Sequence, residues 1–220
     1  MPYRRTDNVV RKLAARHAAI LEAARLLASE AGMAAVQIVP VAERAGIATG
    51  TVYRYFPSKT ELVAALVAAL SEAELAALAR AGDAAPGPLS ALAAAITTFA
   101  ARAIGNRRLA FALIAEPVEP AIDALRVGYR RALAGAFEAR IRTALAGGHL
   151  PAQDAAVAAP ALLGALIEGL VGPLAPAAAP ARSHVQMLTL FALRALGVVD
   201  ARARGLVVQT ALPPADEGPA

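Results

Sequence analysis

The chain has 220 residues, of which 58% are apolar and 18% are charged, and it contains no cysteine. This length is enough for one full-sized core, or for a small module beside a larger one. The lack of cysteine excludes disulfide frameworks, thiolate zinc sites and cysteine nucleophiles. The first residues are charged without an apolar run behind them, so we expect no secretory signal and a cytoplasmic protein.

Positive charge is concentrated toward the N-terminus. Residues 1–60 hold nine Lys and Arg against four Asp and Glu, whereas residues 61–220 hold thirteen of each kind. The first 60 residues therefore carry the whole formal net charge of +5. A basic segment on a neutral body indicates an anionic partner, with nucleic acid as the first candidate and a membrane surface as the second.

Apolar residues recur at helical spacing almost throughout the chain, and the first such run covers residues 9–30. Asn8 can cap its start and Gly32 lies just beyond its end, so we predict one long helix. His17 falls on or near the apolar face of this helix. No second histidine lies four residues away, so we interpret His17 as a packing residue rather than a metal ligand.

Two short helices separated by a glycine turn are predicted next. The first covers about residues 40–45, where Pro40 is tolerated because the amides of a first helical turn need no helical partner. Gly46 permits the positive φ angle of a sharp turn. The second short helix then covers about residues 49–56.

The second short helix has one apolar face. Val52 and Phe56 are four residues apart and can pack on the preceding helix and turn. Their expected partners are Val41, Ala45 and Ile47. A helix, a glycine turn and a short helix with polar and aromatic side chains facing solvent are typical of a helix-turn-helix, whose second helix enters the DNA major groove. An ordinary pair of helices with a decorated surface is the alternative, since short glycine turns are common.

A fourth helix is predicted to run to about Arg80. Ser58 and Glu61 have the spacing of a capping box, and Leu62 begins a new apolar run. The start of this helix, with Lys59, offers amides and a positive charge to a phosphate.

The run AERAGIATGTVYRYFPSKTELVAAL, preceded by ILEAARLLASEAG, resembles the DNA-binding domain of the TetR family of transcriptional regulators. The likeness covers roughly residues 16–68, and its motif residues follow in order without gaps: Ala42, Ala45, Gly46, Gly50, Thr51, Tyr53, Phe56, Lys59 and Leu62. In that family the recognition helix contacts bases and backbone, and the tyrosine and lysine bind phosphates. The resemblance therefore implies these DNA-contacting residues: Thr49, Gly50, Thr51, Tyr53, Arg54, Tyr55 and Lys59.

Some positions depart from the family pattern. The family usually begins its second helix with a threonine and often an arginine that touch the DNA backbone, whereas this chain has Gln37 and Val39, followed by Pro40. The frequent serine before the recognition helix is Ala48 here. A basic arm could supply backbone contacts instead, although a solvated tail explains its first two residues as well. The arm consists of Arg4, Arg5, Arg11 and Lys12.

The rest of the chain predicts five more helices, which makes about nine in all. They cover about residues 89–104, 107–115, 120–146, 153–172 and 183–196. The last is expected to begin at a capping box of Ser183 and Gln186 and to stop at Gly197. The stretch 155–181 has Glu168 as its single charge, but prolines limit its helix to fewer than the ~20 residues that a bilayer requires, so we expect no membrane span. These prolines are Pro160, Pro173, Pro176 and Pro180.

The resemblance implies an all-α fold with an N-terminal three-helix helix-turn-helix domain (residues 1–57, with helix 58–81 as connector). A C-terminal effector-binding and dimerisation domain follows (58–212), and the tail 213–220 is expected to be disordered. It also implies a homodimer through helices 153–172 and 183–196. Stripes of small and aliphatic residues fit such a helix contact, although burial within a monomer explains them equally. The alternative stripes are Ala161, Ala165 and Gly172, or Leu162, Leu166 and Gly169.

The implied function is ligand-responsive repression from a pseudo-palindromic double-stranded DNA operator, with the two recognition helices about 34–36 Å apart. A small-molecule effector would shift the population toward a conformation that fits the operator less well. Its pocket is expected among helices 62–147, and an uncharged or weakly anionic apolar molecule is the expected effector. Candidate apolar lining residues are Phe99, Phe111, Leu113, Tyr129 and Phe137, and candidate polar anchors are Arg107, Glu116, Arg126, Tyr129, Arg130 and His149.

Two other classes of protein fit the sequence less well. An enzyme would need a nucleophile with its base, a metal cluster or a phosphate loop, and the three histidines are scattered without such a motif. We therefore expect no catalytic residue, metal or cofactor. A protein of the same fold that acts through a protein partner, or on DNA without a ligand, is the second class. Operator binding should weaken steeply with salt, whereas binding to an apolar protein partner should not.

Overall fold

The computed structural model describes residues 7–175 and 181–212. Over these residues all regular elements are helices, ten of them α-helices and one a 3-10 helix (η1). They are α1 (Asp7–Ala31), η1 (Met33–Ala35), α2 (Ile38–Arg44), α3 (Thr49–Tyr55), α4 (Lys59–Asp83), α5 (Pro88–Gly105), α6 (Arg107–Ile114), α7 (Pro120–Ala146), α8 (Ala155–Leu170), α9 (Ala181–Ala195) and α10 (Asp200–Gln209). The predicted all-α class is confirmed. Arg4, Arg5 and the tail 213–220 lie outside the described residues.

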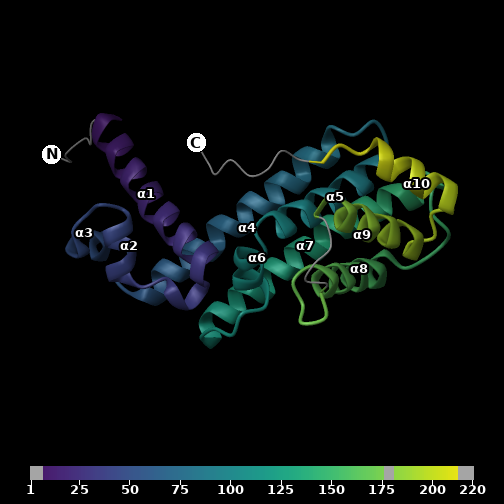
Figure 1. Cartoon of the computed structure of the whole chain (residues 1–220). Coiled ribbons are helices and arrows are strands. Elements are labelled where there is room, and N and C mark those ends of the chain that lie inside the picture. The colour runs from purple at the N-terminus through teal and green to yellow at the C-terminus, as the bar shows by residue number, and fades with distance from the viewer. Residues whose placement is uncertain (1–6, 176–180, 213–220) are drawn as a thin grey trace.

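Figure 1 shows the helices in two groups, with α4 extending from one group into the other. At one end α1, η1, α2 and α3 lie beside the beginning of α4. At the other end α5 to α10 gather around the rest of α4, which packs on α5 and α7, while α5 packs on α9. The two groups also meet directly, because α6 packs against α1.

The interior of the larger group is built around α5 and α7. Leu133, Phe137 and Ile141, each four residues apart, form a fully buried stripe along α7. Leu92 and Ile96 of α5 are equally buried. Burying a side chain of this size contributes roughly 1.5–3 kcal/mol relative to leaving it in water, so this stripe is a main source of stability.

The tenth helix, α10, was not predicted from the sequence. It buries only Ala203 and Leu206, and this is too short a pattern to indicate a helix. Hydrogen bonds from Arg204 and Arg194 hold the pKa of Asp200, at the start of α10, below its ordinary value. Polar contacts at its first turn therefore help to define α10.

Two expected helix starts were wrong. α1 already includes Asp7, so Asn8 is not the residue that precedes it, and α9 includes Ala181, so Ser183 lies inside its first turn. Pro160 lies within α8, which stays inside the expected range 153–172. Both Pro160 and Ala156 are exposed, and water can satisfy the carbonyl oxygen that the proline leaves without a helical donor.

Two helices, α4 and α5, are long and apolar enough to cross a membrane on length and composition alone. The protein itself buries 56% of the most apolar window of α5 and 33% of that of α4. Core helices of soluble proteins pass the same test, so it is weak support for a membrane span.

Candidate nucleic-acid interface and ligand cavity

The turn between α2 and α3 depends on Gly46, which has a φ angle of 65°. Its amide donates to the carbonyl of Glu43 at 3.1 Å, and the amide of Ile47 donates to the carbonyl of Ala42 at 3.0 Å. A residue with a Cβ atom reaches this region of φ only at a cost. The glycine therefore closes α2 and turns the chain sharply into α3, as the sequence predicted.

One face of α3 is anchored in the protein. Val52 is fully buried and Phe56 is 4% exposed, and both belong to the cluster that contains Val41. Ala45 and Ile47 pack against the same cluster, and α2 contacts α3, in agreement with the predicted packing of α3 on α2. One face of α3 is therefore buried and the other is left to solvent.

The histidine on α1 packs against the end of α3. The His17 ring lies 5.1 Å from the ring of Phe56 and 6.3 Å from that of Tyr55. This agrees with the interpretation of His17 as a packing residue. Among the described residues no group of three or more His, Cys, Asp and Glu could hold a metal ion.

The open face of α3 and the start of α4 carry the seven residues expected to contact DNA. Gly50, Tyr53 and Arg54 are exposed, Tyr53 with 51% of its surface. A Cβ atom added at Gly50 would meet no atom within 4 Å, so packing inside the protein does not require glycine there. The other four side chains are half-buried: Thr49, Thr51, Tyr55 and Lys59.

The start of α4 is capped as predicted. The Ser58 hydroxyl oxygen accepts a hydrogen bond from the amide of Glu61 at 3.1 Å. This cap fixes the first turn of α4, where Lys59 is the first residue. Lys59 is thus placed directly after α3 and its following loop.

The positions that depart from the family pattern have ordinary structural roles. Gln37 precedes α2 but caps none of its amides, and its side-chain nitrogen donates to the carbonyl of Ala34 at 2.9 Å. Val39 is 52% exposed, and Pro40 is the third residue of α2, which begins two residues earlier than expected. Ala48 leaves α3 without a side-chain cap.

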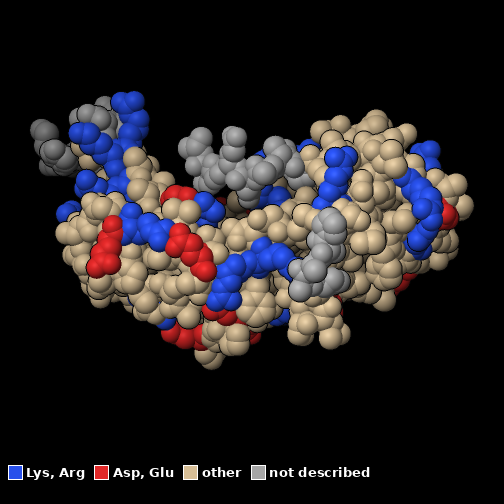
Figure 2. All heavy atoms as spheres, in the orientation of Figure 1, with Lys and Arg blue, Asp and Glu red and all other residues tan. Residues whose placement is uncertain are grey.

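Basic residues gather on the same end of the molecule. Arg11, Lys12 and Arg16 are exposed along α1, and Figure 2 shows a concentration of Lys and Arg over this helix. Arg44 of α2 is committed elsewhere, because it forms an ion pair with Glu30 at 2.7 Å. Hydrogen bonding to Glu30 raises the pKa of Arg44. The unpaired charge that faces solvent here therefore comes mainly from α1.

A cavity of about 280 Å³ lies where α1, α4, α5, α6 and α7 meet. Its walls are mostly apolar, with these residues among them: Leu21, Leu66, Leu70, Phe99, Leu109 and Leu113. Of the residues expected to line an effector pocket, Phe99, Leu113 and Tyr129 line this cavity. The cavity lies partly within the expected range of helices 62–147, which includes α4, but the contribution of α1 was missed.

The remaining expected pocket residues lie elsewhere. Phe137 is fully buried behind the cavity, with its ring edge-on to that of Phe99 at 6.2 Å between centroids. The others do not line the cavity either: Arg107, Phe111, Glu116, Arg126, Arg130 and His149.

The polar groups of the cavity are largely paired with one another. Arg102 forms an ion pair with Glu74 at 2.7 Å, and Arg25 forms one with Glu22 at 2.6 Å. Tyr129 is 4% exposed, and burial raises the pKa of its phenol, so the hydroxyl stays protonated. The cavity therefore presents an apolar surface with a neutral donor and two internally balanced ion pairs.

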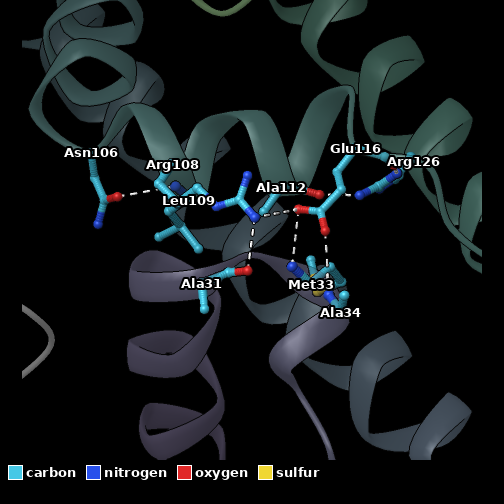
Figure 3. Close-up of polar contacts among 9 residues, drawn as sticks. All are labelled: Ala31, Met33, Ala34, Asn106, Arg108, Leu109, Ala112, Glu116 and Arg126. Carbon is cyan, nitrogen blue, oxygen red and sulfur yellow. Dashed lines mark hydrogen bonds and ion pairs between the residues drawn. The ribbon is translucent and has the colours of Figure 1, made fainter.

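Glu116 and Arg126 bind the main chain of the protein (Figure 3). The Glu116 carboxylate accepts hydrogen bonds from the amides of Met33 at 3.0 Å and Ala34 at 3.3 Å. Arg126 is 2% exposed and donates to the carbonyl oxygens of Ala112 and Glu116. Burial lowers the pKa of Arg126, and the charge of Glu116 opposes this effect. Both residues hold the chain together rather than pointing into the cavity.

Comparison with known families identifies the N-terminal helices. The sequence model described as bacterial regulatory proteins, tetR family, matches residues 20–66, which include α2, α3 and the turn between them. The N-terminal helices therefore match the DNA-binding domain of the TetR family. TetR proteins are transcriptional regulators and not enzymes.

Curated TetR relatives match over the same region. The chain is 55% identical over 49 residues to the HTH-type transcriptional repressor KstR of Rhodococcus jostii (strain RHA1), covering 22% of this chain and 23% of KstR. For KstR of Mycobacterium tuberculosis the identity is 54% over 44 residues, covering 20% of each chain. The chain thus matches less than a quarter of the length of these curated repressors.

Solved structures extend the likeness to the whole TetR fold. RolR without ligand is 25% identical with a TM-score of 0.65, covering 90% of this chain and all of that one. RolR in complex with resorcinol is 23% identical with a TM-score of 0.66, covering 94% of this chain. A regulatory protein in the tetR family from Rhodococcus RHA1 is 22% identical with a TM-score of 0.68, covering 84% of this chain and 98% of that one. The predicted TetR-like fold is therefore confirmed.

Proposed function

We propose that this protein is a cytoplasmic transcriptional repressor that binds a pseudo-palindromic DNA operator as a homodimer and is released by a small apolar effector. The observation that carries the proposal is the arrangement of α3, whose one face is buried while the other is open to solvent at the basic end of the molecule. A short helix presented in this way fits the major groove of DNA. In this proposal residues 1–57 read DNA, and residues 58–212 bind the effector and dimerise.

Each residue of the interface has a role in this proposal. Gly50 lets the backbone of α3 approach DNA closely, because no Cβ atom intervenes. Thr49, Thr51 and Arg54 read base edges or nearby phosphates, and Tyr53 and Lys59 bind phosphates. Tyr55, which packs beside His17, contacts the DNA backbone at the flank of α3.

The proposed dimer uses the exposed faces of α8 and α9. Met187 and Phe191 lie one turn apart on α9 and are 54% and 53% exposed. On α8, Val157 is 65% exposed and Ala161 continues the same face. Of the two stripes considered from the sequence, the one with Leu162 and Leu166 is buried within the single chain. The small-residue stripe through Ala161 is therefore the one that we assign to the dimer.

The effector in this proposal is a neutral, mainly apolar molecule that occupies the 280 Å³ cavity. Both ion pairs at its wall are already balanced, so an ionised ligand would be buried without a partner charge. The phenol of Tyr129 can donate one hydrogen bond to such a molecule. RolR, which is similar in fold and whose structure contains resorcinol, gives a precedent for a small neutral ligand.

Matched aromatic probes test the ligand class. We expect 2-naphthol to bind to the wild-type protein at least ten-fold more tightly than 2-naphthoate, because the carboxylate would lose its hydration without a free cation to meet it. Isothermal titration calorimetry measures both affinities, with Tyr129→Phe as the variant that should weaken naphthol binding. Equal or tighter binding of the carboxylate contradicts a neutral effector.

Operator binding is tested with sheared genomic DNA and the purified protein. We expect wild type to enrich one pseudo-palindromic site. Tyr53→Ala and Lys59→Ala should each weaken binding to it by at least about 100-fold, since a dimer loses the contact in both half-sites, each roughly 1.5–3 kcal/mol for a charge-assisted hydrogen bond. Fluorescence anisotropy at two salt concentrations measures the affinities.

Arg202→Ala is the matched control, because Arg202 is an exposed arginine on α10, at the far end of the molecule (Figure 1). It should leave operator affinity within two-fold of wild type. If the folded wild-type protein enriches no sequence, the operator proposal fails. A protein partner, bound with little dependence on salt, would then be the better explanation.

A further inference from the structure

The segment that follows α6 forms hydrogen bonds to the connection between α1 and α2 (Figure 3). Glu116 accepts hydrogen bonds from two successive amides of η1, those of Met33 and Ala34. Arg108 of α6 donates to the carbonyl of Ala31, the last residue of α1, at 2.7 Å and lies 3.8 Å from the Glu116 carboxylate. The Arg108 cation thus binds a carbonyl oxygen at the end of α1. The Glu116 anion binds two amides at the start of η1.

The fit at this contact is close. Gly32, between the two bonded positions, is buried and has a φ angle of 87°. A Cβ atom there would overlap the guanidinium of Arg108 and approach the Glu116 carboxylate to 2.6 Å. Glycine is therefore favoured at this point by its backbone angle, and a Cβ atom there would displace the ends of the Arg108 and Glu116 side chains.

The holding segment is itself rigid because of Arg126. This buried arginine, which comes from α7, binds the carbonyl oxygens of Ala112 and Glu116 at the end of α6. Carbonyl groups at a helix end have no helical partner, and Arg126 supplies one. Arg126 thus binds α6 and Glu116 to the same side chain.

α6 also forms a wall of the cavity. Leu109, Ala110 and Leu113 face the cavity, whereas Arg108, in the same short helix, contacts Ala31. A molecule that displaces the first set would also move Arg108 and Glu116, which contact the end of α1 and η1. Two residues separate η1 from α2, so a shift of η1 changes the position of α2 and α3.

We propose that Glu116 is the positioning residue through which occupancy of the cavity changes the orientation of the helix-turn-helix. This inference rests on the proposed function, and it names the regulation of the same site. Glu116 touches neither the ligand nor DNA; it acts through the amides of Met33 and Ala34. When the cavity is occupied, the protein favours a conformation in which these two hydrogen bonds are broken or displaced. This shift couples the cavity to the helix-turn-helix.

The test uses a variant whose own side chain fills the cavity at all times. This variant takes the place of the ligand. Ala110→Phe adds a ring on the cavity wall of α6, and it should weaken operator binding by about ten-fold, a usual size for allosteric coupling. In a Glu116→Gln background the same filling should change operator affinity by less than two-fold, because the charged acceptor that transmits it is gone. Fluorescence anisotropy on the four proteins gives the complete cycle.

Glu119→Gln is the matched control. Glu119 lies in the same connection and accepts a hydrogen bond from the Thr60 hydroxyl at 3.0 Å, so it is a nearby acid that bonds to α4 rather than to η1. In the Glu119→Gln background, Ala110→Phe should still weaken operator binding by about ten-fold. An equal effect of Ala110→Phe with and without Glu116→Gln overturns the inference.

A second measurement separates this inference from the proposed function. Hydrogen exchange of the Met33 and Ala34 amides should become at least ten-fold faster in Ala110→Phe than in wild type, with no DNA present, because the fraction of broken bonds rises. Unchanged exchange at both amides overturns the inference even if operator binding is real. Faster exchange in a protein that binds no operator supports the coupling while the repressor proposal fails. If Glu116→Gln does not fold, the exchange of these two amides in Ala110→Phe still tests the inference.

Discussion

Replacing Phe191 with glutamate is expected to give a folded monomer that no longer binds the operator specifically. Phe191 is 53% exposed in the single chain, so the substitution costs little within the protomer. In the proposed dimer it would bury two unpaired carboxylates, one from each protomer, against apolar α8 and α9 faces. A monomer reads one half-site, and the affinity should fall toward the non-specific level, roughly 10³-fold or more.

Sedimentation velocity measures the state of assembly, and fluorescence anisotropy measures operator affinity in the same buffer. Val208→Glu is the matched control, because Val208 is 80% exposed on α10 and lies away from the proposed interface. The control should remain a dimer with wild-type affinity. A Phe191→Glu protein that stays dimeric would move the interface away from α9.

The largest effect on stability is expected from Phe137→Ala. The ring is fully buried in the stripe along α7 and packs edge-on against Phe99. Its removal takes away a large apolar side chain and leaves a cavity, and together these cost about 3–5 kcal/mol. Urea unfolding followed by circular dichroism measures the change in the free energy of unfolding.

Phe111→Ala provides the comparison for this substitution. Phe111 is half-buried on α6, with the Arg108 guanidinium 6.0 Å from its ring centre, so its loss should cost clearly less than that of Phe137. Both variants keep the unfolding slope of wild type if the unfolded state is unchanged. Equal destabilisation by the two substitutions would mean that the interior around Phe137 collapses to fill the space.

The N-terminal half of the fold could be read from the sequence because its signals are local. Gly46 sets the turn by its backbone angle, and Ser58 caps α4 through a residue three positions away. Val52 and Phe56 show their buried face by their spacing alone. Each of these features involves neighbouring residues, and propensity, spacing and capping agree at each of them.

The cavity and the Glu116 contact could not be read in the same way. Glu116 and Arg126 were expected to face an effector because they are charged residues between apolar helices, yet both bind main-chain groups. The amide of Met33 lies 83 residues from Glu116 in the chain, and no local pattern marks it as a partner. The wall that α1 contributes to the cavity was missed for the same reason, since only packing brings α1 beside α6.

The distance in sequence between Met33 and Glu116 also orders events during synthesis. The N-terminal helices leave the ribosome first and can form their own core, with Ile20, Val41 and Val52 in it, before α6 exists. The amides of Met33 and Ala34 then have only water as acceptor until Glu116 emerges. A nascent chain in which residues 1–57 have folded therefore waits for 59 more residues, from residue 57 to Glu116, at about 5–20 residues per second, before this tether can form. Fixing that unit in its final orientation is among the later steps of folding.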